Sequence, residues 1–151
     1  IIVVLYHIKI KLYTIHIYWI KGISLELNTH LKLDNDINGK VVELKEKYSK
    51  VELSTKDFMS ADSEGLVHGG FAFCAADFAA MAAVNNPYVV LAKSETKFLA
   101  PVKIGETMIF EANITAEDRN KSTVEVIGYV NNNEIFKGTF YTVTLNKHIL
   151  N

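Results

Sequence analysis

The sequence predicts an α+β domain in which a curved antiparallel β-sheet encloses one long apolar helix. Residues 70–84 are almost wholly apolar and rich in alanine, so a helix there has no polar face for water and must be covered. Its many alanines allow a sheet to approach closely. Residues 88–146 then alternate polar and apolar residues in four stretches, which is typical of antiparallel strands with one buried face.

Length and composition fit one globular domain. The chain has 151 residues, of which 49% are hydrophobic and 22% charged, enough to bury one core without disulfides or metal. A net charge of -1 gives no overall attraction to nucleic acid or to an anionic membrane. The single cysteine, Cys74, excludes an internal disulfide and a cysteine-based metal site, and it fits a reducing compartment. We therefore expect a cytoplasmic protein.

The first 22 residues form an apolar segment that differs in composition from the rest of the chain. Lysines and histidines interrupt it, so no stretch reaches the roughly 20 apolar residues of a membrane span. The charge order and cleavage site of a signal peptide are also missing. We expect residues 1–22 to be an N-terminal apolar segment of uncertain origin, without an assigned function, and residues 23–151 to form a single domain.

The elements of the domain are expected in the following order. Residues 23–38 are expected to form a short helix or a lead-in, and residues 40–54 are expected to form two short strands or one bent strand. A polar loop precedes the apolar helix, which ends where Asn85 forms a C-cap and Pro87 bars a further turn. The last four strands are expected to form a meander with hairpin-type turns, over residues 88–100, 107–118, 122–132 and 134–146.

Asp77 stands alone in the middle of the apolar helix. Burying a carboxylate without a partner costs several kcal/mol, so its presence needs a reason. Gly70 lies seven residues earlier, on nearly the same helix face and about 10 Å along the axis. The helix begins at or near His68, Gly69 and Gly70, where unpaired N–H groups and the positive end of the dipole suit an oxygen that gains negative charge.

A carboxylate beside such a carbonyl acts as a general base on water or as a nucleophile. Asp77 is too far from its own helix start for one carbonyl to contact both, so a catalytic pair requires two antiparallel helices and at least a dimer. The structural alternative is a buried carboxylate that caps a loop or bonds a backbone amide. His68 is expected to orient the loop, and because no second histidine lies near it in sequence, we expect no metal site.

The stretch GLVHGGFAFCAAD, the alanine-rich helix and the later KFLAPVKIGE resemble the hotdog-fold acyl-CoA thioesterases of the phenylacetate-degradation (PaaI-like) group. Members of that group carry His-Gly-Gly at the start of the central helix and an acidic residue nine positions after the histidine. His68 and Asp77 share this spacing, and Pro101 and Gly105 match a further segment. The resemblance covers roughly residues 40–146 and implies the hotdog fold.

The resemblance also implies roles for individual residues. Asp77 would be the general base or nucleophile, and the Gly70 N–H, with that of Gly69, would polarise the thioester carbonyl. The residues expected to bind substrate are His68, Gly69, Asp62 and Phe71. Asp62 stands where many relatives have an asparagine and Leu91 where some have a serine, so the positioning of the attacking water departs from the family pattern.

Two further groups of side chains are open to alternative interpretations. Phe71, Phe73, Phe78 and Met81 line an acyl tunnel in the functional interpretation and are ordinary core residues in the structural one. Three lysines either contact the phosphates of CoA or are solvated: Lys93, Lys97 and Lys103.

The expected function is therefore hydrolysis of an acyl-CoA thioester to a free acid and CoA. We expect a homodimer or dimer of dimers with the active site at the dimer interface. Apart from the CoA of the substrate we expect no cofactor, no metal, no nucleic acid and no membrane partner. One alternative is a non-catalytic protein of the same fold that binds acyl-CoA or fatty-acyl ligands, in which the helix carboxylate is typically missing. The second alternative is a hotdog-fold hydratase or dehydratase, whose chemistry requires a histidine and a carboxylate close together.

Overall fold

The computed structural model describes residues 25–151. The predicted N-terminal segment, residues 1–22, lies outside the described residues, and the boundary between it and the domain stays a prediction. The described elements are, in order, α2 (Asn35–Asn38), β1 (Lys40–Lys45), β2 (Tyr48–Ser54), the 3-10 helix η1 (Asp57–Met59), α3 (Gly69–Val84), β3 (Val89–Phe98), β4 (Thr107–Asp118), β5 (Lys121–Val130) and β6 (Asn133–Thr144).

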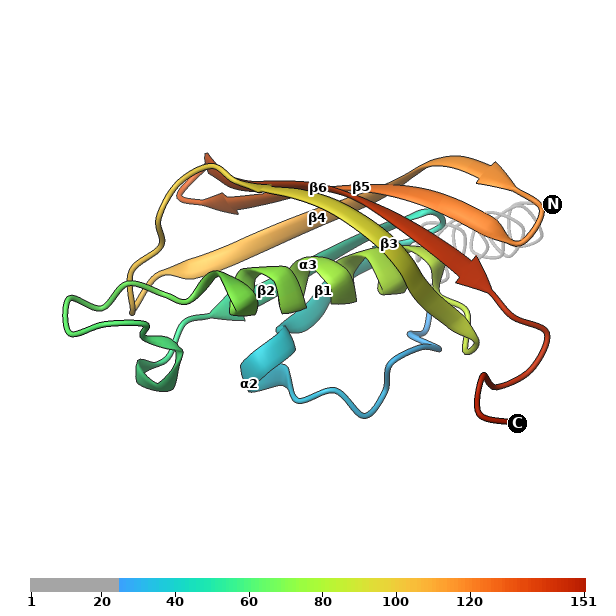
Figure 1. Ribbon diagram of the computed structural model, residues 1–151, viewed down its shortest axis with the longest axis horizontal. Coiled ribbons are helices and arrows are strands. Elements are labelled where there is room, and N and C mark those ends of the chain that lie inside the picture. Colours follow the sequence, from blue (N-terminus) through green and yellow to red (C-terminus); the bar gives the residue numbers. More distant parts are fainter. Residues whose placement is uncertain (1–24) are drawn as a thin grey trace, which may run out of the picture.

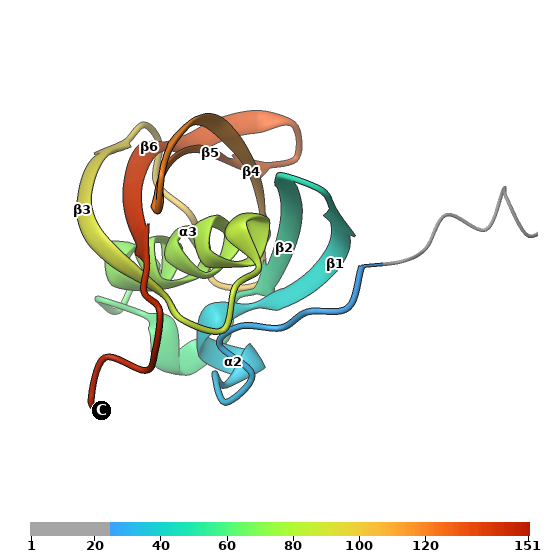
Figure 2. The ribbon, with the colours of Figure 1, turned by 90° about the vertical axis from the view of Figure 1, so that its right-hand side faces the viewer.

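One antiparallel sheet contains all six strands, in the order β1-β2-β4-β5-β6-β3. It curves over α3, while α2 and the lead-in to β1 lie on the opposite side of the helix (Figures 1 and 2). This confirms the predicted α+β arrangement. Of the two possibilities for residues 40–54, the two short strands β1 and β2 are the ones that form.

The prediction of a four-strand meander after the helix is wrong for its first strand. Strands β4, β5 and β6 do form a meander, but β3 pairs with β6 and not with β4, whose other neighbour is β2. The connection from β3 to β4, residues 99–106, passes the N-terminal end of α3 rather than forming a hairpin (Figure 1). Pairing β3 with β6 extends the sheet around the helix, a long-range effect that alternation within a strand does not encode.

Helix α3 has the boundaries that its sequence predicts. It begins at Gly69, directly after His68, and it ends with Asn85 in the left-handed conformation at φ 51° and ψ 43°. The Asn85 side chain also donates to the Glu26 carbonyl (2.9 Å) and accepts from the Asn28 N–H (2.7 Å). The C-cap thereby ties the lead-in to the end of the helix.

The core lies between the inner face of the sheet and the alanines of α3. All seven helix alanines are buried, and large side chains from the sheet, including Phe110, Phe136 and Phe140, cover them. The buried Ser49 hydroxyl on β2 donates to the Ala79 carbonyl at 2.7 Å, so even the helix backbone is joined to the sheet. Small helix side chains permit this close approach.

One stripe of α3 departs from the prediction of an enclosed helix. Gly70, Phe73, Cys74 and Asp77 are only half-buried by the described chain. Their spacing of three and four residues puts them on one face of the helix. The sheet covers the alanine-rich faces and leaves this stripe partly open, because a single curved sheet does not close completely around a helix.

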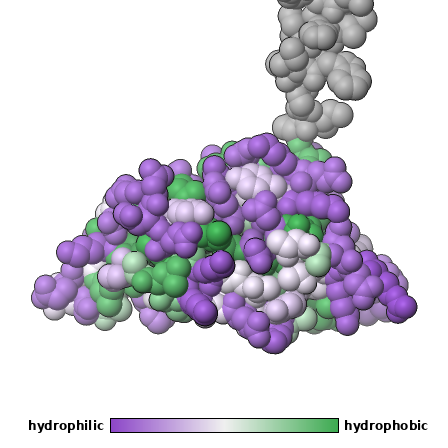
Figure 3. All heavy atoms as spheres, turned by 90° about the horizontal axis from the view of Figure 1, so that it is seen from above, coloured by the Kyte–Doolittle hydropathy of each residue, from purple (hydrophilic) through white to green (hydrophobic). Residues whose placement is uncertain are grey.

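The outer face of the sheet is mostly hydrophilic, with small apolar patches between polar side chains (Figure 3). This agrees with the alternation along the strands, in which inward positions are buried and outward positions are exposed or half-buried. Within residues 25–151, no helix has both the length and the apolar character needed to cross a bilayer.

Candidate functional site

The start of α3 is held by the loop that precedes it. The His68 N–H donates to the Met59 carbonyl and the Val67 N–H to the Val102 carbonyl, both at 2.9 Å. These bonds attach the helix start to η1 on one side and to the β3–β4 connection on the other. The position of the first helical turn is therefore fixed by groups far apart in sequence.

Asp62 organises the loop itself. Its exposed carboxylate accepts hydrogen bonds from the backbone N–H groups of Glu64 (2.9 Å) and Leu66 (3.1 Å). This is the behaviour of a turn residue, since a short carboxylate readily satisfies nearby backbone donors. A contact between Asp62 and substrate stays a prediction.

Two aromatic rings flank the glycines at the helix start. A Cβ atom added to Gly69 would lie 3.0 Å from the Phe98 ring, and one added to Gly70 would lie 3.0 Å from the exposed His68 ring. Both glycines therefore allow a ring to lie against the backbone. As first-turn residues they also have N–H groups without an intrahelical acceptor, and no backbone bond joins these two groups to another described residue outside the helix.

Phe71 completes an aromatic group beside this turn. Its ring packs edge-on against Phe58, with centroids 5.7 Å apart, and against His68 at 6.3 Å. Phe58 is more than half exposed, and no motif in the sequence singles it out, because it lies ten residues before His68. The predicted site residues His68, Gly69, Gly70 and Phe71 do lie together.

Asp77 lies two turns further along the half-open stripe of α3, about 10 Å from the helix start. Its Oδ1 atom is buried, and no described residue donates a hydrogen bond to it. Burial raises the pKa of the Asp77 carboxyl to about 6, because desolvation disfavours its charged form. The sequence predicts that Asp77 and Gly70 of one chain are too far apart to contact the same carbonyl group, and their separation of two helical turns agrees with this.

Because the pKa of Asp77 is raised in the folded protein, the free energy of unfolding should depend on pH. Between about pH 4 and pH 6 Asp77 keeps its proton in the folded chain but has lost it in the unfolded chain. The stabilisation by this proton is greatest below pH 4 and is lost as the pH rises through 6. We expect Asp77→Asn to raise the free energy of unfolding at pH 8 by about 1–2 kcal/mol and to leave it nearly unchanged at pH 4. Urea unfolding at both pH values measures this, and equal effects at both would contradict it.

Cys74 lies one turn before Asp77 on the same stripe. Burial, and then the nearby charge of Asp77, raise the pKa of its thiol. A thiolate nucleophile is therefore disfavoured. The thiol is half-buried.

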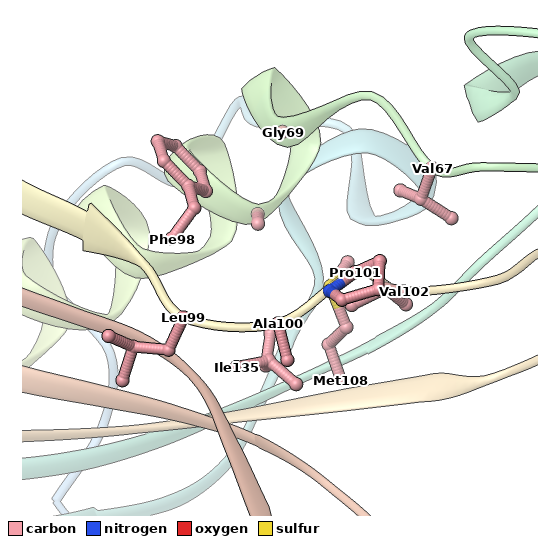
Figure 4. Close-up of a pocket in the computed structure, with 10 residues that line it drawn as sticks. Val67, Gly69, Phe98, Leu99, Ala100, Pro101, Val102, Met108 and Ile135 are labelled. Carbon is pink, nitrogen blue, oxygen red and sulfur yellow. The ribbon is translucent and has the colours of Figure 1, made fainter.

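An apolar cavity opens beside the start of α3. Its volume is about 390 Å³. Figure 4 shows its walls: Gly69 at the helix start, Val67 before it, Phe98 at the end of β3, Leu99 and Val102 from the β3–β4 connection, and Met108 and Ile135 from the sheet. The sequence did not predict this cavity. Its only local signal is the apolar run from Phe98 to Val102 at the end of a strand, of which Phe98 and Leu99 are exposed.

The other candidate lining residues are distributed between core and surface. Phe78 and Met81 are buried core residues, as their structural interpretation predicts, while Phe73 is half-buried against the Phe140 ring. Lys93 pairs with Glu95 at 2.9 Å and lies over the Tyr141 ring. In the part of the chain that the structure describes, no group of three or more histidine, cysteine or acidic side chains is arranged to hold a metal ion.

Comparison with known proteins identifies the relatives of this chain. The thioesterase superfamily model matches residues 64–135, from the loop before α3 to the start of β6. A solved structure of an uncharacterized protein, PH1136 of Pyrococcus horikoshii, is 44% identical with a TM-score of 0.84, and the match covers 86% of this chain and all of that one. Cj0977, a sigma28-regulated virulence protein of Campylobacter jejuni, is 33% identical with a TM-score of 0.81, over 83% of this chain and 89% of that one.

The curated relatives are longer proteins. A methylthioribose-1-phosphate isomerase of Aquifex aeolicus is 44% identical over 121 residues, which are 80% of this chain and 26% of the relative. The transcription factor FapR of Oceanobacillus iheyensis is 31% identical over 109 residues, 70% of this chain and 56% of the relative. The chain thus spans about a quarter to just over half of the length of these curated relatives.

More distant structures share the fold. A variant of the phenylacetic acid degradation protein PaaI of Thermus thermophilus is 22% identical with a TM-score of 0.67, over 72% of this chain and 95% of that one. A hypothetical thioesterase of Streptococcus pneumoniae, solved with coenzyme A, is 17% identical with a TM-score of 0.66, over 74% and 88%. The resemblance predicted from the sequence is thereby confirmed at the level of fold and superfamily: the chain belongs to the thioesterase superfamily of hotdog-fold proteins.

Proposed function

We propose that the protein hydrolyses an acyl-CoA thioester to a free carboxylic acid and CoA. The observation that carries this proposal is Asp77, a carboxylate whose buried oxygen receives no hydrogen bond from the described residues on the one stripe of α3 that the chain leaves partly open. A chain that only needed a packed helix would favour alanine there, as at the buried positions around it.

The proposed chemistry uses the two ends of that stripe. The Gly70 N–H, with that of Gly69, donates to the thioester carbonyl oxygen and stabilises the negative charge that develops on it. Asp77 takes a proton from water as the water oxygen bonds to the carbonyl carbon, the C–S bond breaks, and CoA leaves as its thiol. In the second form of the mechanism Asp77 attacks the carbonyl carbon itself, the C–S bond breaks, and CoA leaves as a thiolate that takes a proton from water. A water molecule then cleaves the resulting mixed anhydride, which releases the free acid and restores the Asp77 carboxylate. His68 and Phe71 would flank the bound thioester.

This chemistry requires two chains. Because Asp77 and Gly70 of one helix are about 10 Å apart, one carbonyl meets both functions only if Gly70 of the partner subunit faces Asp77 across a two-fold axis. The half-open stripe of α3 would then pack against its own copy. We expect a dimer or a dimer of dimers at micromolar concentration in light scattering, and a stable active monomer would contradict this arrangement.

Asp77 also sets the expected pH dependence of turnover. Burial raises the pKa of Asp77 to about 6, and only the carboxylate form accepts a proton or attacks carbon. We expect kcat to fall about tenfold per pH unit well below pH 6 and to reach a plateau above about pH 7. A pH–rate profile from 4.5 to 8.5 measures this, and a plateau that continues down to pH 4.5 would contradict the role of Asp77.

The similarity to FapR supports a second candidate function. A relative that is 31% identical is named as a transcription factor, so binding of an acyl ligand without turnover is the alternative for the same site. A protein that only binds its ligand does not need a catalytic carboxylate, so the cost of burying Asp77 would have no explanation. Hydrolysis explains this cost and is therefore the preferred function.

Release of free thiol from a panel of short, long and aryl acyl-CoAs separates the two functions. Thiol release above the uncatalysed rate, together with acid product, is the expected result. Tight binding of the same acyl-CoAs in calorimetry without any thiol release would favour the ligand-binding function and overturn hydrolysis. A cytoplasmic location and the absence of a cofactor other than CoA belong to this proposal.

A further inference from the structure

The cavity beside the start of α3 has walls with unusually uniform chemistry. All of its lining side chains are apolar or glycine. Two backbone donors in the wall are already used, because the Leu99 and Ala100 N–H groups donate to the Ile135 carbonyl (2.8 and 3.4 Å). The Gly69 N–H, also in the wall, is one of the two proposed donors to the thioester carbonyl. No side chain of the wall can therefore replace the hydrogen bonds to water that a hydroxyl or carboxylate would lose there, whereas a hydrocarbon has none to lose.

The cavity also has a defined position relative to the reacting group. Gly69 forms part of its wall, and Gly69 and Gly70 are the proposed donors to the thioester carbonyl. A thioester held there has two arms that lead away from it. The pantetheine arm contains two amides and a hydroxyl, and the acyl arm of a simple fatty or aryl acid contains none.

We propose that this cavity receives the acyl arm and makes the enzyme selective for uncharged acyl groups of medium length, an inference that rests on the proposed function. The volume of about 390 Å³ sets the length. A methylene group occupies about as much space as a water molecule, roughly 30 Å³, so the whole volume corresponds to about 13 carbons. Because the mouth is open and part of this space stays with solvent, we expect the cavity to hold about six to ten. Phenylacyl groups fall in the same range.

The length and charge of the acyl group provide the first test. We would measure kcat/KM, and Kd by calorimetry, for a straight-chain series from butanoyl- to tetradecanoyl-CoA. Each methylene buried should raise kcat/KM up to about fourfold, until an optimum between six and ten carbons, after which the value falls. Adipoyl-CoA, in which a carboxylate replaces the terminal methyl group of hexanoyl-CoA, should be at least ~10²-fold poorer, because its charge would lie against the apolar wall.

Two variants at the mouth of the cavity provide the second test. Ala100 and Leu99 are exposed, so changes there do not disturb the core. Ala100→Leu narrows the cavity and should move the optimum to shorter chains, and Leu99→Ala widens it and should move the optimum to longer ones. Matched controls at exposed positions away from the cavity are Ala116→Leu and Leu31→Ala, which should leave the profile unchanged.

The outcomes distinguish this inference from the proposed function. Thiol release with a flat length profile, with equal rates for adipoyl- and hexanoyl-CoA, or with an optimum that neither variant moves would overturn the acyl cavity while leaving the hydrolase intact. If no substrate releases thiol, the hydrolase proposal fails, and the Kd values of the acyl-CoA series then decide whether the cavity binds the acyl group. A length optimum in Kd that the two variants shift supports the cavity, and its absence overturns it.

Discussion

Asp77→Asn is expected to lower kcat for acyl-CoA hydrolysis by at least ~10²-fold, the lower end of the loss when a positioned base is removed. Asparagine keeps the size of the side chain but neither accepts a proton at neutral pH nor attacks carbon. Since burial disfavours the charged carboxylate, the folded protein should be no less stable in the variant. A loss of rate with a gain in stability is the signature of a functional residue held at a structural cost.

The control for this variant is Asp118→Asn, which removes an exposed carboxylate at the end of β4. It should retain wild-type kcat, and both proteins should have the same mass in light scattering. If Asp77→Asn turns over at the wild-type rate with the same assembly state, Asp77 is a structural carboxylate and the catalytic assignment fails.

Gly70→Val is expected to lower kcat by about 10²–10³-fold, the loss typical of one missing oxyanion donor. A Cβ atom added at this position would lie 3.0 Å from the His68 ring, so the branched side chain of valine should displace that ring and cover the N–H beside it. Valine forms helices no worse than glycine, so the helix should persist.

Graded substitution checks this explanation. Gly70→Ala adds only the Cβ atom, which the exposed His68 ring accommodates by a small movement, so its loss of kcat should be smaller than that of valine. Circular dichroism should show unchanged helix content in both. An equally active Gly70→Val would mean that the helix start does not bind the carbonyl.

Much of the local structure follows from the sequence. The ends of α3 were predictable because a glycine pair and the Asn85–Pro87 stretch are strong local signals, and both act within one turn of the helix. Strands β4, β5 and β6 were predictable from alternation, and the turn at Asn131 and Asn132 uses asparagine in the left-handed region, where it is well tolerated.

The remaining features depend on contacts between distant parts of the chain. The position of β3 beside β6 follows from closure of the sheet around α3 and not from the β3 sequence. The cavity requires Val67, Phe98 and Ile135 to converge, although they lie in three separate elements. Within the described chain, the buried Oδ1 of Asp77 has no hydrogen-bond partner, and in the proposed site a second copy of the chain completes its surroundings. The sequence indicates this second copy only through the lone carboxylate in the apolar helix.

Mixing Asp77→Asn with Gly70→Val tests the central claim most directly, namely that each active site combines Asp77 of one chain with Gly70 of the partner subunit. Each variant alone should be nearly inactive. After denaturation and refolding together, half of the dimers should be mixed, and each mixed dimer has one site without either substitution. We predict recovery of about a quarter of wild-type thiol release. If both variants are inactive alone and the refolded mixture is as inactive as each of them, the two groups do not act across a subunit interface and the proposed site is wrong.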